Sequence, residues 1–259
     1  MTSGHLSSSS SLRIVTWNIH KGVRGLAFRK RLEIHAMQEA IGSLNADIIC
    51  LQEVRRINHK EAKRFTQWPS SPQADFLAPP GYEAVYRTNA HTQHGEHGNA
   101  LLSRFPVKHI GHEDVSDHRF EQRGLLHAVL DVQGKDVHVI VVHLGLLAGS
   151  RARQLAQIGE YIQREIAPQA PLVVAGDFNS PIASQRWAHR TLHSSSDKPP
   201  SMLHALKGHP TFPANMPLTQ LDHIFVRGAQ LSKQHVPSEK HWARMSDHLP
   251  LIAQLELPQ

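Results

Sequence analysis

Several short apolar runs in the chain end abruptly in polar residues. The runs, each with the polar residues that follow it, are 14–17 with Asn18, 48–51 with Glu53, 139–142 with His143, and 173–175 with Asp177 and Asn179. Apolar runs of this length between polar stretches are typical of buried strands. Because functional side chains in mixed α/β folds gather where strands end, we expect these polar residues to converge on one site.

Other stretches have the apolar spacing of helices. Residues 29–44 and 150–166 repeat apolar positions with helical periodicity, so we predict a helix in each. Asn45 can end the first helix and Ser150 can begin the second. Further strands are expected at 12–17, 47–51, 82–86, 99–103, 123–132, 137–143, 222–226 and 249–257. Residues 54–82 and 91–98 are polar and are expected to be mostly loop, with a short helix within 57–68.

Strands and helices are mixed irregularly along the chain. The runs 123–132 and 137–143, separated by a short Gly-containing loop, predict a hairpin. A doubly wound parallel sheet would alternate strand and helix throughout. The pattern better suits two mixed, mostly antiparallel sheets packed face to face with helices outside. We expect a Ser-rich disordered tail over 1–11 and a single domain over 12–259, with neither a repeat nor a dividing linker.

The composition limits which kinds of binding partner and which cellular compartment we expect. The 259 residues carry a formal charge of +6, which suits an anionic partner such as nucleic acid, a phospholipid surface or a phosphorylated small molecule. Cys50 is the single cysteine, so no intrachain disulfide can form. Neither a signal peptide nor an apolar run long enough to span a bilayer is evident. We therefore expect a cytoplasmic protein with no stable membrane insertion and no obligate protein partner.

The polar residues at the strand ends suggest a hard metal ion. They offer oxygen and imidazole groups, and no cysteine joins them, which excludes a zinc–thiolate site. Carboxylates with amides suit Mg²⁺, with Mn²⁺ as a substitute. Glu53 is the best ligand candidate, followed by Asp247 and Asn18. Each element alone is weak, because an Asp after a strand is often only a turn former and Asp-His can be a plain surface turn.

The order of these elements carries more information than any one of them. The segments, in chain order, are Trp17-Asn18-Ile19, Leu51-Gln52-Glu53-Val54, 98–104 (GNALLSR), Val142-His143-Leu144, 176–179 (GDFN), 221–225 (LDHIF) and 246–250 (SDHLP). In this order they resemble the endonuclease/exonuclease/phosphatase superfamily, and most of all its small bacterial members. The resemblance spans residues 12–257. It implies a four-layer αββα sandwich, as in pancreatic-type DNase.

The resemblance also implies roles for individual residues. Asn18, Glu53 and Asp247 would hold Mg²⁺. Asp177 and Asn179 would position and activate the attacking water, and His143 would contact a phosphate oxygen. His248, oriented by Asp222, would act on the scissile phosphate, and the choice of Asp177 or His248 as general base stays open. Arg55, Asn99 and Arg123 are candidates for binding substrate, although a surface or structural ion-pair role is as good a reading of Arg55.

The implied activity is hydrolysis of phosphodiester or phosphomonoester bonds with a divalent cation. The basic charge and Arg55 favour an endo- or exonuclease acting on DNA or RNA. The alternative is a phosphodiesterase or phosphatase for a phospholipid headgroup or a small phosphorylated metabolite. AP endonucleases usually carry Tyr-x-Pro-Asn where this chain has residues 143–146 (HLGL), which argues against abasic-site repair. A catalytically silent binding module would need a broken motif, and the chain shows none.

Overall fold

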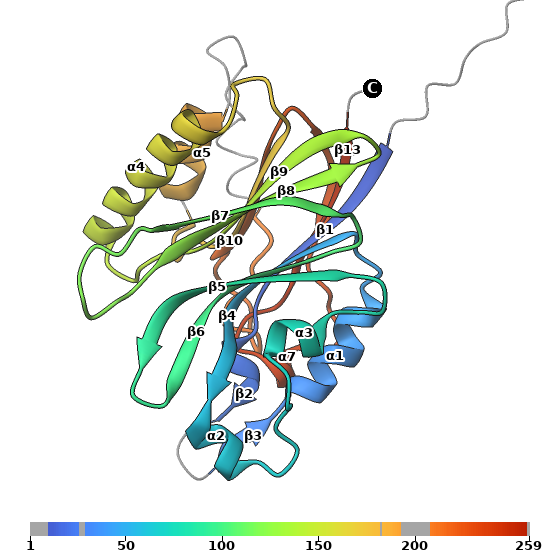
Figure 1. The fold of residues 1–259 in the computed structure, drawn as a ribbon, viewed down its shortest axis with the longest axis vertical. Coiled ribbons are helices and arrows are strands. Elements are labelled where there is room, and N and C mark those ends of the chain that lie inside the picture. Colours follow the sequence, from blue (N-terminus) through green and yellow to red (C-terminus); the bar gives the residue numbers. More distant parts are fainter. Residues whose placement is uncertain (1–9, 26–28, 182, 193–207, 258–259) are drawn as a thin grey trace, which may run out of the picture.

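Two β-sheets packed face to face form the centre of the protein (Figure 1). The structure is a computed structural model, and it describes residues 10–25, 29–181, 183–192 and 208–257. The expected tail over 1–11 lies mostly outside these ranges. Its last two residues, Ser10 and Ser11, instead begin the first strand, where they pair with Leu257 and Glu256.

The first sheet has six strands. In spatial order they are β12 (Gln230–His235), β13 (Leu251–Leu257), β1 (Ser10–Asn18), β4 (Ile48–Asn58), β6 (Gly95–Ser103) and β5 (Glu83–Thr92). Only β1 and β4 are parallel neighbours, with Trp17 opposite Leu51 and Asn18 opposite Gln52. Parallel pairing brings the ends of these two strands, with Asn18 and Glu53, to the same edge of the sheet.

The second sheet has five strands. In spatial order they are β11 (Asp222–Arg227), β10 (Leu172–Asp177), β9 (Lys135–His143), β8 (Gly124–Val132) and β7 (Val107–Asp114). Strands β9 and β10 are parallel, whereas the other pairs are antiparallel. The predicted hairpin joins β8 to β9 through Gln133 and Gly134, both at positive φ, as a tight two-residue turn requires.

Helices cover the outer faces of both sheets (Figure 1). On the second sheet lie α4 (Ala148–Glu165) and α5 (Ala183–Leu192), and on the first lie α1 (Ile34–Ser43), α3 (Gln73–Leu77) and α7 (Trp242–Met245). Leu155, Ile158 and Ile162 form the buried stripe of α4, one helical turn apart. The connecting elements are η1 (His20–Gly22), β2 (Val23–Arg24), β3 (Arg31–Leu32) and α2 (His59–Arg64).

Three apolar layers hold these elements together. One fills the space between the sheets, with Ile14, Cys50 and Val139 among its members. The other two lie between each sheet and its own helices. The order helix, sheet, sheet, helix confirms the predicted four-layer αββα sandwich. No helix within the described ranges combines the length and the apolar character needed to cross a bilayer.

Local expectations failed where the apolar pattern was weak. Strand β4 continues through polar residues to Asn58, and β6 already begins at Gly95, because this half-exposed hairpin region buries little on either face. The edge strands β7 and β12 were not predicted for the same reason. Helix α4 begins before Ser150, whose hydroxyl donates to Asp117 instead of capping the helix. Asn45 does end α1, at a φ of 45°.

Candidate active site

The second sheet places three polar side chains side by side. In the parallel pair β9–β10, Asp177 is opposite His143, and in the antiparallel pair β10–β11 it is opposite Asp222. Residues directly opposite on neighbouring strands project on the same side of the sheet. Strand pairing alone therefore gathers His143, Asp177 and Asp222 at the end of β10.

Several residues around this position have strained backbones. Within the described ranges, six residues other than glycine have a positive φ, and four of them lie here: His20 (45°), Lys21 (62°), Glu53 (56°) and Asn179 (49°). Each such conformation costs on the order of 1–3 kcal/mol and persists only where the surroundings enforce it. At Glu53 the strain accompanies an irregularity in the β4–β6 pairing between Leu51 and Val54. Strain of this kind concentrates at functional sites.

One half of the site is an acid–imidazole group, formed by His143, Asp177, Asp222 and His248. The Asp177 Oδ2 lies 3.6 Å from the Nε2 atoms of both His143 and His248. The Nδ1 of His248 is 2.8 Å from the Asp222 Oδ2. Thr211 also donates its hydroxyl to that Asp222 oxygen, at 2.6 Å. All four members of the group are buried.

Burial and neighbouring charges shift the pKa values of the two imidazoles in opposite directions. Burial, reinforced by the nearby Arg123 guanidinium, lowers the pKa of His143 to about 4. Burial also acts to lower the pKa of His248, but the Asp222 carboxylate outweighs it and raises that pKa to about 10. Burial raises the pKa of Asp177. At neutral pH the group therefore contains a neutral His143, a protonated His248 and an acid that accepts a proton readily.

The other half is a carboxylate pair, Glu53 and Asp247, which lies beside Lys21 and His20. Lys21 Nζ is 2.6 Å from Glu53 Oε2. His20 Nδ1 lies 3.3 Å from Asp247 Oδ2 and 4.0 Å from Glu53 Oε2. Burial raises the pKa of Glu53, but Lys21 and His143 outweigh it, and the net shift is downward. The His20 ring therefore lies between the two carboxylates, and the Lys21 ammonium lies against Glu53.

The sequence profile of the Endonuclease/Exonuclease/phosphatase family matches residues 15–248. The chain belongs to this family. An uncharacterized protein of Escherichia coli strain K12, YbhP, is 36% identical over 255 residues, which cover 95% of this chain and 97% of the relative.

Solved structures from the family agree with the fold. A family protein from Leptotrichia buccalis superposes with a TM-score of 0.70 at 17% identity, covering 95% of this chain and 100% of that chain. A mannosyl-6-phosphatase from Bacteroides thetaiotaomicron has a TM-score of 0.64 at 15% identity, covering 94% and 99% of the two chains. At such identities the likeness shows the fold alone. Family membership makes this protein a hydrolase of phosphate esters.

Divalent metals are general in this family, and the carboxylate pair fits one. Glu53 and Asp247 direct oxygen atoms toward the place where the Lys21 ammonium and the His20 ring now lie. Oxygen-only ligands around a point that already attracts positive charge suit Mg²⁺ or Mn²⁺. Ligand atoms of Asp177, Asp222 and His248 also lie within 4.8 Å of one another. We disfavour that cluster as the metal site, because Asp222 already accepts hydrogen bonds from Thr211 and His248 there.

Two asparagines hold Asp177, and one of them, Asn18, also connects it to the other half of the site. Asn18 donates its Nδ2 to Asp177 at 3.0 Å and accepts the backbone N–H of His20 on its Oδ1 at 3.1 Å. Asn179 donates its backbone N–H to Asp177 at 2.9 Å and its Nδ2 to the Leu144 carbonyl. The Asn18 side chain and the Asn179 backbone thereby fix the Asp177 carboxylate. Metal ligation by Asn18 and water activation by Asn179 stay predictions.

Of the predicted substrate-binding residues, two are arginines near the site and one is a buried asparagine that joins the two sheets. Arg55 lies beside Glu53, and its guanidinium lies 5.8 Å from the Trp68 ring centre. Arg123, near His143, pairs with Glu121 at 3.2 Å. Asn99 is fully buried and donates its Nδ2 to the carbonyls of Gly124 and Val141, which ties β6 to the second sheet. Its observed contacts are structural, and a contact with substrate stays a prediction.

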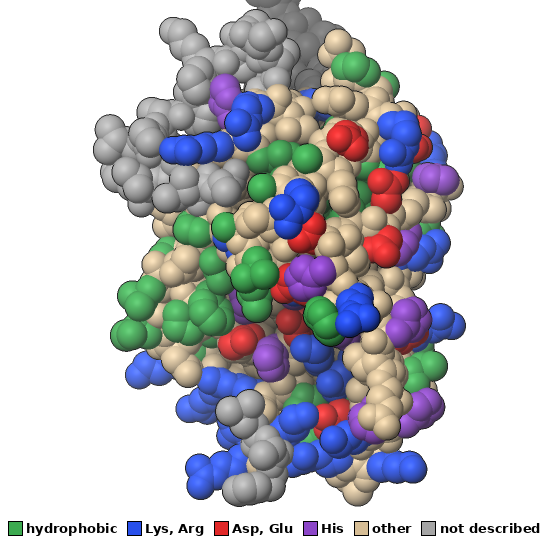
Figure 2. All heavy atoms as spheres, turned by 90° about the vertical axis from the view of Figure 1, so that its left-hand side faces the viewer, with side chains coloured by type: hydrophobic (Ala, Val, Ile, Leu, Met, Phe, Trp, Pro, Cys, Tyr) green, Lys and Arg blue, Asp and Glu red, His purple; other side chains and the backbone are tan. Residues whose placement is uncertain are grey.

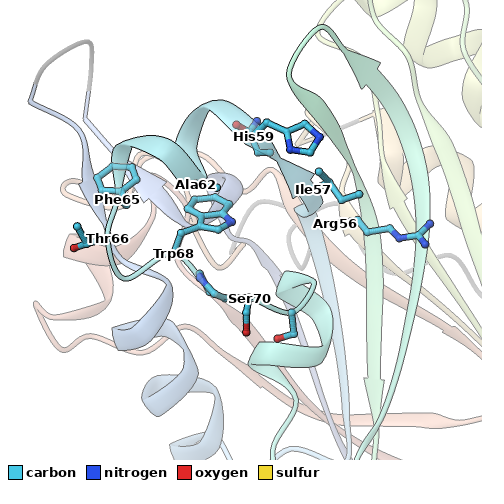
Figure 3. A pocket seen from close by; sticks show the side chains of 11 residues that line it. Arg56, Ile57, His59, Ala62, Phe65, Thr66, Trp68 and Ser70 are labelled. Carbon is cyan, nitrogen blue, oxygen red and sulfur yellow. The ribbon is translucent and has the colours of Figure 1, made fainter.

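A pocket of about 370 Å³ lies beyond Arg55, around α2 (Figure 3). Phe65 and Trp68 belong to its wall, and their rings are 16° from parallel with centres 6.4 Å apart. Arg56 and His59 also line it. Near the pocket, Gln73 links Arg55 to the site, since it accepts the Arg55 backbone N–H and donates to the Lys21 carbonyl.

Sequence reasoning did not assign roles to His20, Lys21 or Thr211. The first two stood in a loop that was read only as Gly-rich and basic, although they directly follow Asn18. That proximity was the available signal. Thr211 gave none, because it reaches Asp222 from a Pro-rich loop through tertiary packing.

Proposed function

We propose that this protein is a divalent-cation-dependent phosphodiesterase. The observation that carries the proposal is the position of the Asp177 carboxylate, between two imidazoles and hydrogen bonded to both asparagines. In-line hydrolysis needs a group that takes a proton from water beside groups that neutralise the phosphate. Glu53 and Asp247 would hold the cation, with Asn18 beside them, and the cation supplies positive charge to the phosphate oxygens.

In this proposal Asp177 accepts a proton and His248 stabilises negative charge. Asp177, whose pKa burial raises, accepts the proton of the attacking water as its oxygen bonds to phosphorus and the bond from phosphorus to the leaving ester oxygen breaks. His248 remains protonated because Asp222 holds its Nδ1, so its Nε2–H stabilises charge that develops on the phosphate. His143 is neutral and donates its ring N–H to a phosphate oxygen. We thus assign the base to Asp177.

Nucleic acid is the proposed substrate, and the surroundings of Glu53 support it. Arg55 and His97 are cross-strand neighbours on β4 and β6, and Lys21 and Arg123 are close enough to His97 to lower its pKa. Burial is the first cause of that lowering, to about 4. Cationic groups near a phosphate site attract a polyanion, and the Phe65 and Trp68 rings nearby offer surfaces on which a base can stack.

A phospholipid headgroup is the second candidate substrate. The observation in its favour is a set of exposed apolar side chains in loops next to His143 and His248, which nucleic acid does not need. The mannosyl-6-phosphatase among the structural neighbours shows that this fold also accepts small phosphorylated compounds. A cytoplasmic location stays a prediction.

A metal-supplemented substrate screen tests the proposal. Plasmid, oligonucleotides, phospholipids and generic phosphodiesters are incubated with Mg²⁺ or Mn²⁺, with the Asp177→Asn protein as control. We expect hydrolysis by the native chain and none by the variant, whose circular dichroism spectrum and melting curve should stay native. Cleavage of lipid but not of nucleic acid would select the second candidate. Retained hydrolysis by the variant would reject the role of Asp177.

A further inference from the structure

Exposed apolar side chains concentrate around the entrance of the site. Seven large hydrophobic residues within the described ranges are exposed, and five of them lie in three loops at this entrance. We call these five the apolar rim: Phe120 (82% exposed), Leu146 (68%), Leu147 (63%), Met216 (62%) and Leu218 (67%). Single exposed apolar residues are common, but a group of them beside a functional site needs a reason.

One part of the rim lies next to His143. Leu146 and Leu147 follow it on the loop that leads from β9 into α4. The backbone N–H of Leu146 donates to the Glu121 carboxylate at 3.0 Å, so the loop that carries Phe120 lies against the loop that carries the two leucines. These three side chains therefore form one side of the entrance.

The other part lies next to His248. Met216 and Leu218 are on the loop that follows Phe212, whose ring centre is 4.9 Å from that of His248. Ala214 on this loop donates its N–H to the Asp247 carbonyl at 2.7 Å. The loop is thus attached to the site itself. The acid–imidazole group lies between the two parts of the rim, since Asp177 Oδ2 is 3.6 Å from both histidines.

Cationic side chains accompany the apolar ones. The Arg119 guanidinium lies 4.7 Å from the ring centre of Phe120. On the other side, Arg24 donates to the side chain of Asn215, the neighbour of Met216. Figure 2, which looks onto this part of the molecule, shows hydrophobic, His and acidic side chains together, with many Lys and Arg side chains below them. Surfaces that bind anionic bilayers typically combine exposed apolar side chains with adjacent Arg or Lys side chains.

We propose that the apolar rim inserts into the surface of an anionic phospholipid bilayer and holds the protein at the membrane. Nucleic acid gains little from aliphatic side chains, because its affinity comes mainly from phosphate contacts. The bilayer instead removes these five side chains from water while Arg119 and Arg24 meet lipid phosphates. This binding step goes beyond the proposed hydrolysis and does not depend on it.

Co-sedimentation of the full chain with vesicles tests the rim. Vesicles of phosphatidylcholine alone are compared with vesicles that contain phosphatidylglycerol, without added metal. We expect binding to the anionic vesicles, and a partition coefficient at least about tenfold lower for the Leu146→Ser/Leu147→Ser double variant, because two leucines lose their apolar burial. Met216→Ser/Leu218→Ser should weaken binding similarly. The matched control is Leu231→Ser, an exposed leucine on β12 away from the site, which should bind as the native chain does.

The outcomes separate the possible occupants of the rim. Failure of the native chain to bind anionic vesicles overturns the proposal, and so does equal loss of binding in Leu231→Ser. If the rim variants bind vesicles normally but weaken binding of an oligonucleotide, the face binds nucleic acid. If they dissolve a dimer seen by sedimentation equilibrium and do not affect vesicle binding, the rim is a contact between two copies. Because vesicle binding needs no turnover, a failure of the proposed hydrolysis leaves this test intact.

Discussion

Glu53 and Asp177 are carboxylates in the two halves of the site, and their surroundings shift their pKa values in opposite directions. Glu53 faces the Lys21 ammonium at 2.6 Å, and its pKa is lowered although burial acts to raise it. Asp177 faces two imidazoles and two amide N–H groups, and burial raises its pKa. One carboxylate is thereby kept charged, while the other can receive a proton. The same functional group serves cation binding in one place and proton transfer in the other because its neighbours differ.

The largest expected effect is a loss of activity, and its dependence on Mg²⁺ should distinguish the two carboxylates. Asp177→Asn should lower kcat by roughly 10³-fold at every Mg²⁺ concentration, since no base remains. Glu53→Gln should also be inactive at low Mg²⁺, but excess Mg²⁺ should restore part of its activity. Initial rates measured across a Mg²⁺ titration distinguish the two patterns. If excess metal rescues Asp177→Asn, or fails to affect Glu53→Gln, the division between the carboxylates is wrong.

The next effect concerns the proton on His248. Asp222→Asn removes the negative partner of Nδ1 and should lower kcat about a hundredfold. Burial would then lower the pKa of His248, which Asp222 now raises to about 10. If the protonated imidazole is the active form, activity in this variant should disappear at a lower pH than in the native chain. A pH–rate profile checks this, and an unchanged alkaline limb would contradict the role of His248.

A smaller effect concerns the pH dependence of folding stability, which comes from buried histidines that have no carboxylate partner. His127, hydrogen bonded to Tyr161 and His138, and His223, beside Ser184, both have their pKa lowered to about 4 by burial. Each is neutral in the folded state and takes a proton more readily when unfolded. Stability should be full above about pH 6.5 and should fall as the pH drops toward 4, by roughly 2 kcal/mol per histidine at pH 5.

Urea denaturation at pH 7 and pH 5 measures that loss. A matched His127→Gln variant keeps a polar side chain that does not titrate, so its stability should change less between the two pH values. Equal pH dependence in the native chain and the variant would show that His127 is not neutral when folded.

The smallest effect concerns the ammonium beside Glu53. Lys21→Met keeps the length of the side chain and removes its charge, so a divalent cation no longer competes with Nζ for Glu53. The Mg²⁺ concentration at half-maximal activity should fall by about threefold, as expected for the loss of one partly exposed charge pair. A rise in KM with unchanged metal dependence would instead place Lys21 on the substrate phosphate.

Much of the site was predictable because the sequence marks strand ends clearly. Apolar runs fully buried between two layers are followed at once by Asn18, His143 and Asp177, and strand pairing then brings such ends together. The polar half of β4 was not predictable, because its residues 55–58 show neither helical nor alternating periodicity. Asn99 stood where a polar loop meets an apolar strand, and only its burial between the sheets revealed its bridging contacts.

The sequence by itself determined the fold class, the family and the chemical types of the site residues, because these depend on local pattern and order. Tertiary structure decided which groups are charged. Lys21 reaches Glu53 only through a left-handed turn at His20 and Lys21, and Thr211 reaches Asp222 only from a distant loop. It also decided that five exposed apolar residues lie on three separate loops beside the site. Charge state and surface grouping depend on distances between residues far apart in the chain, and no local pattern encodes those distances.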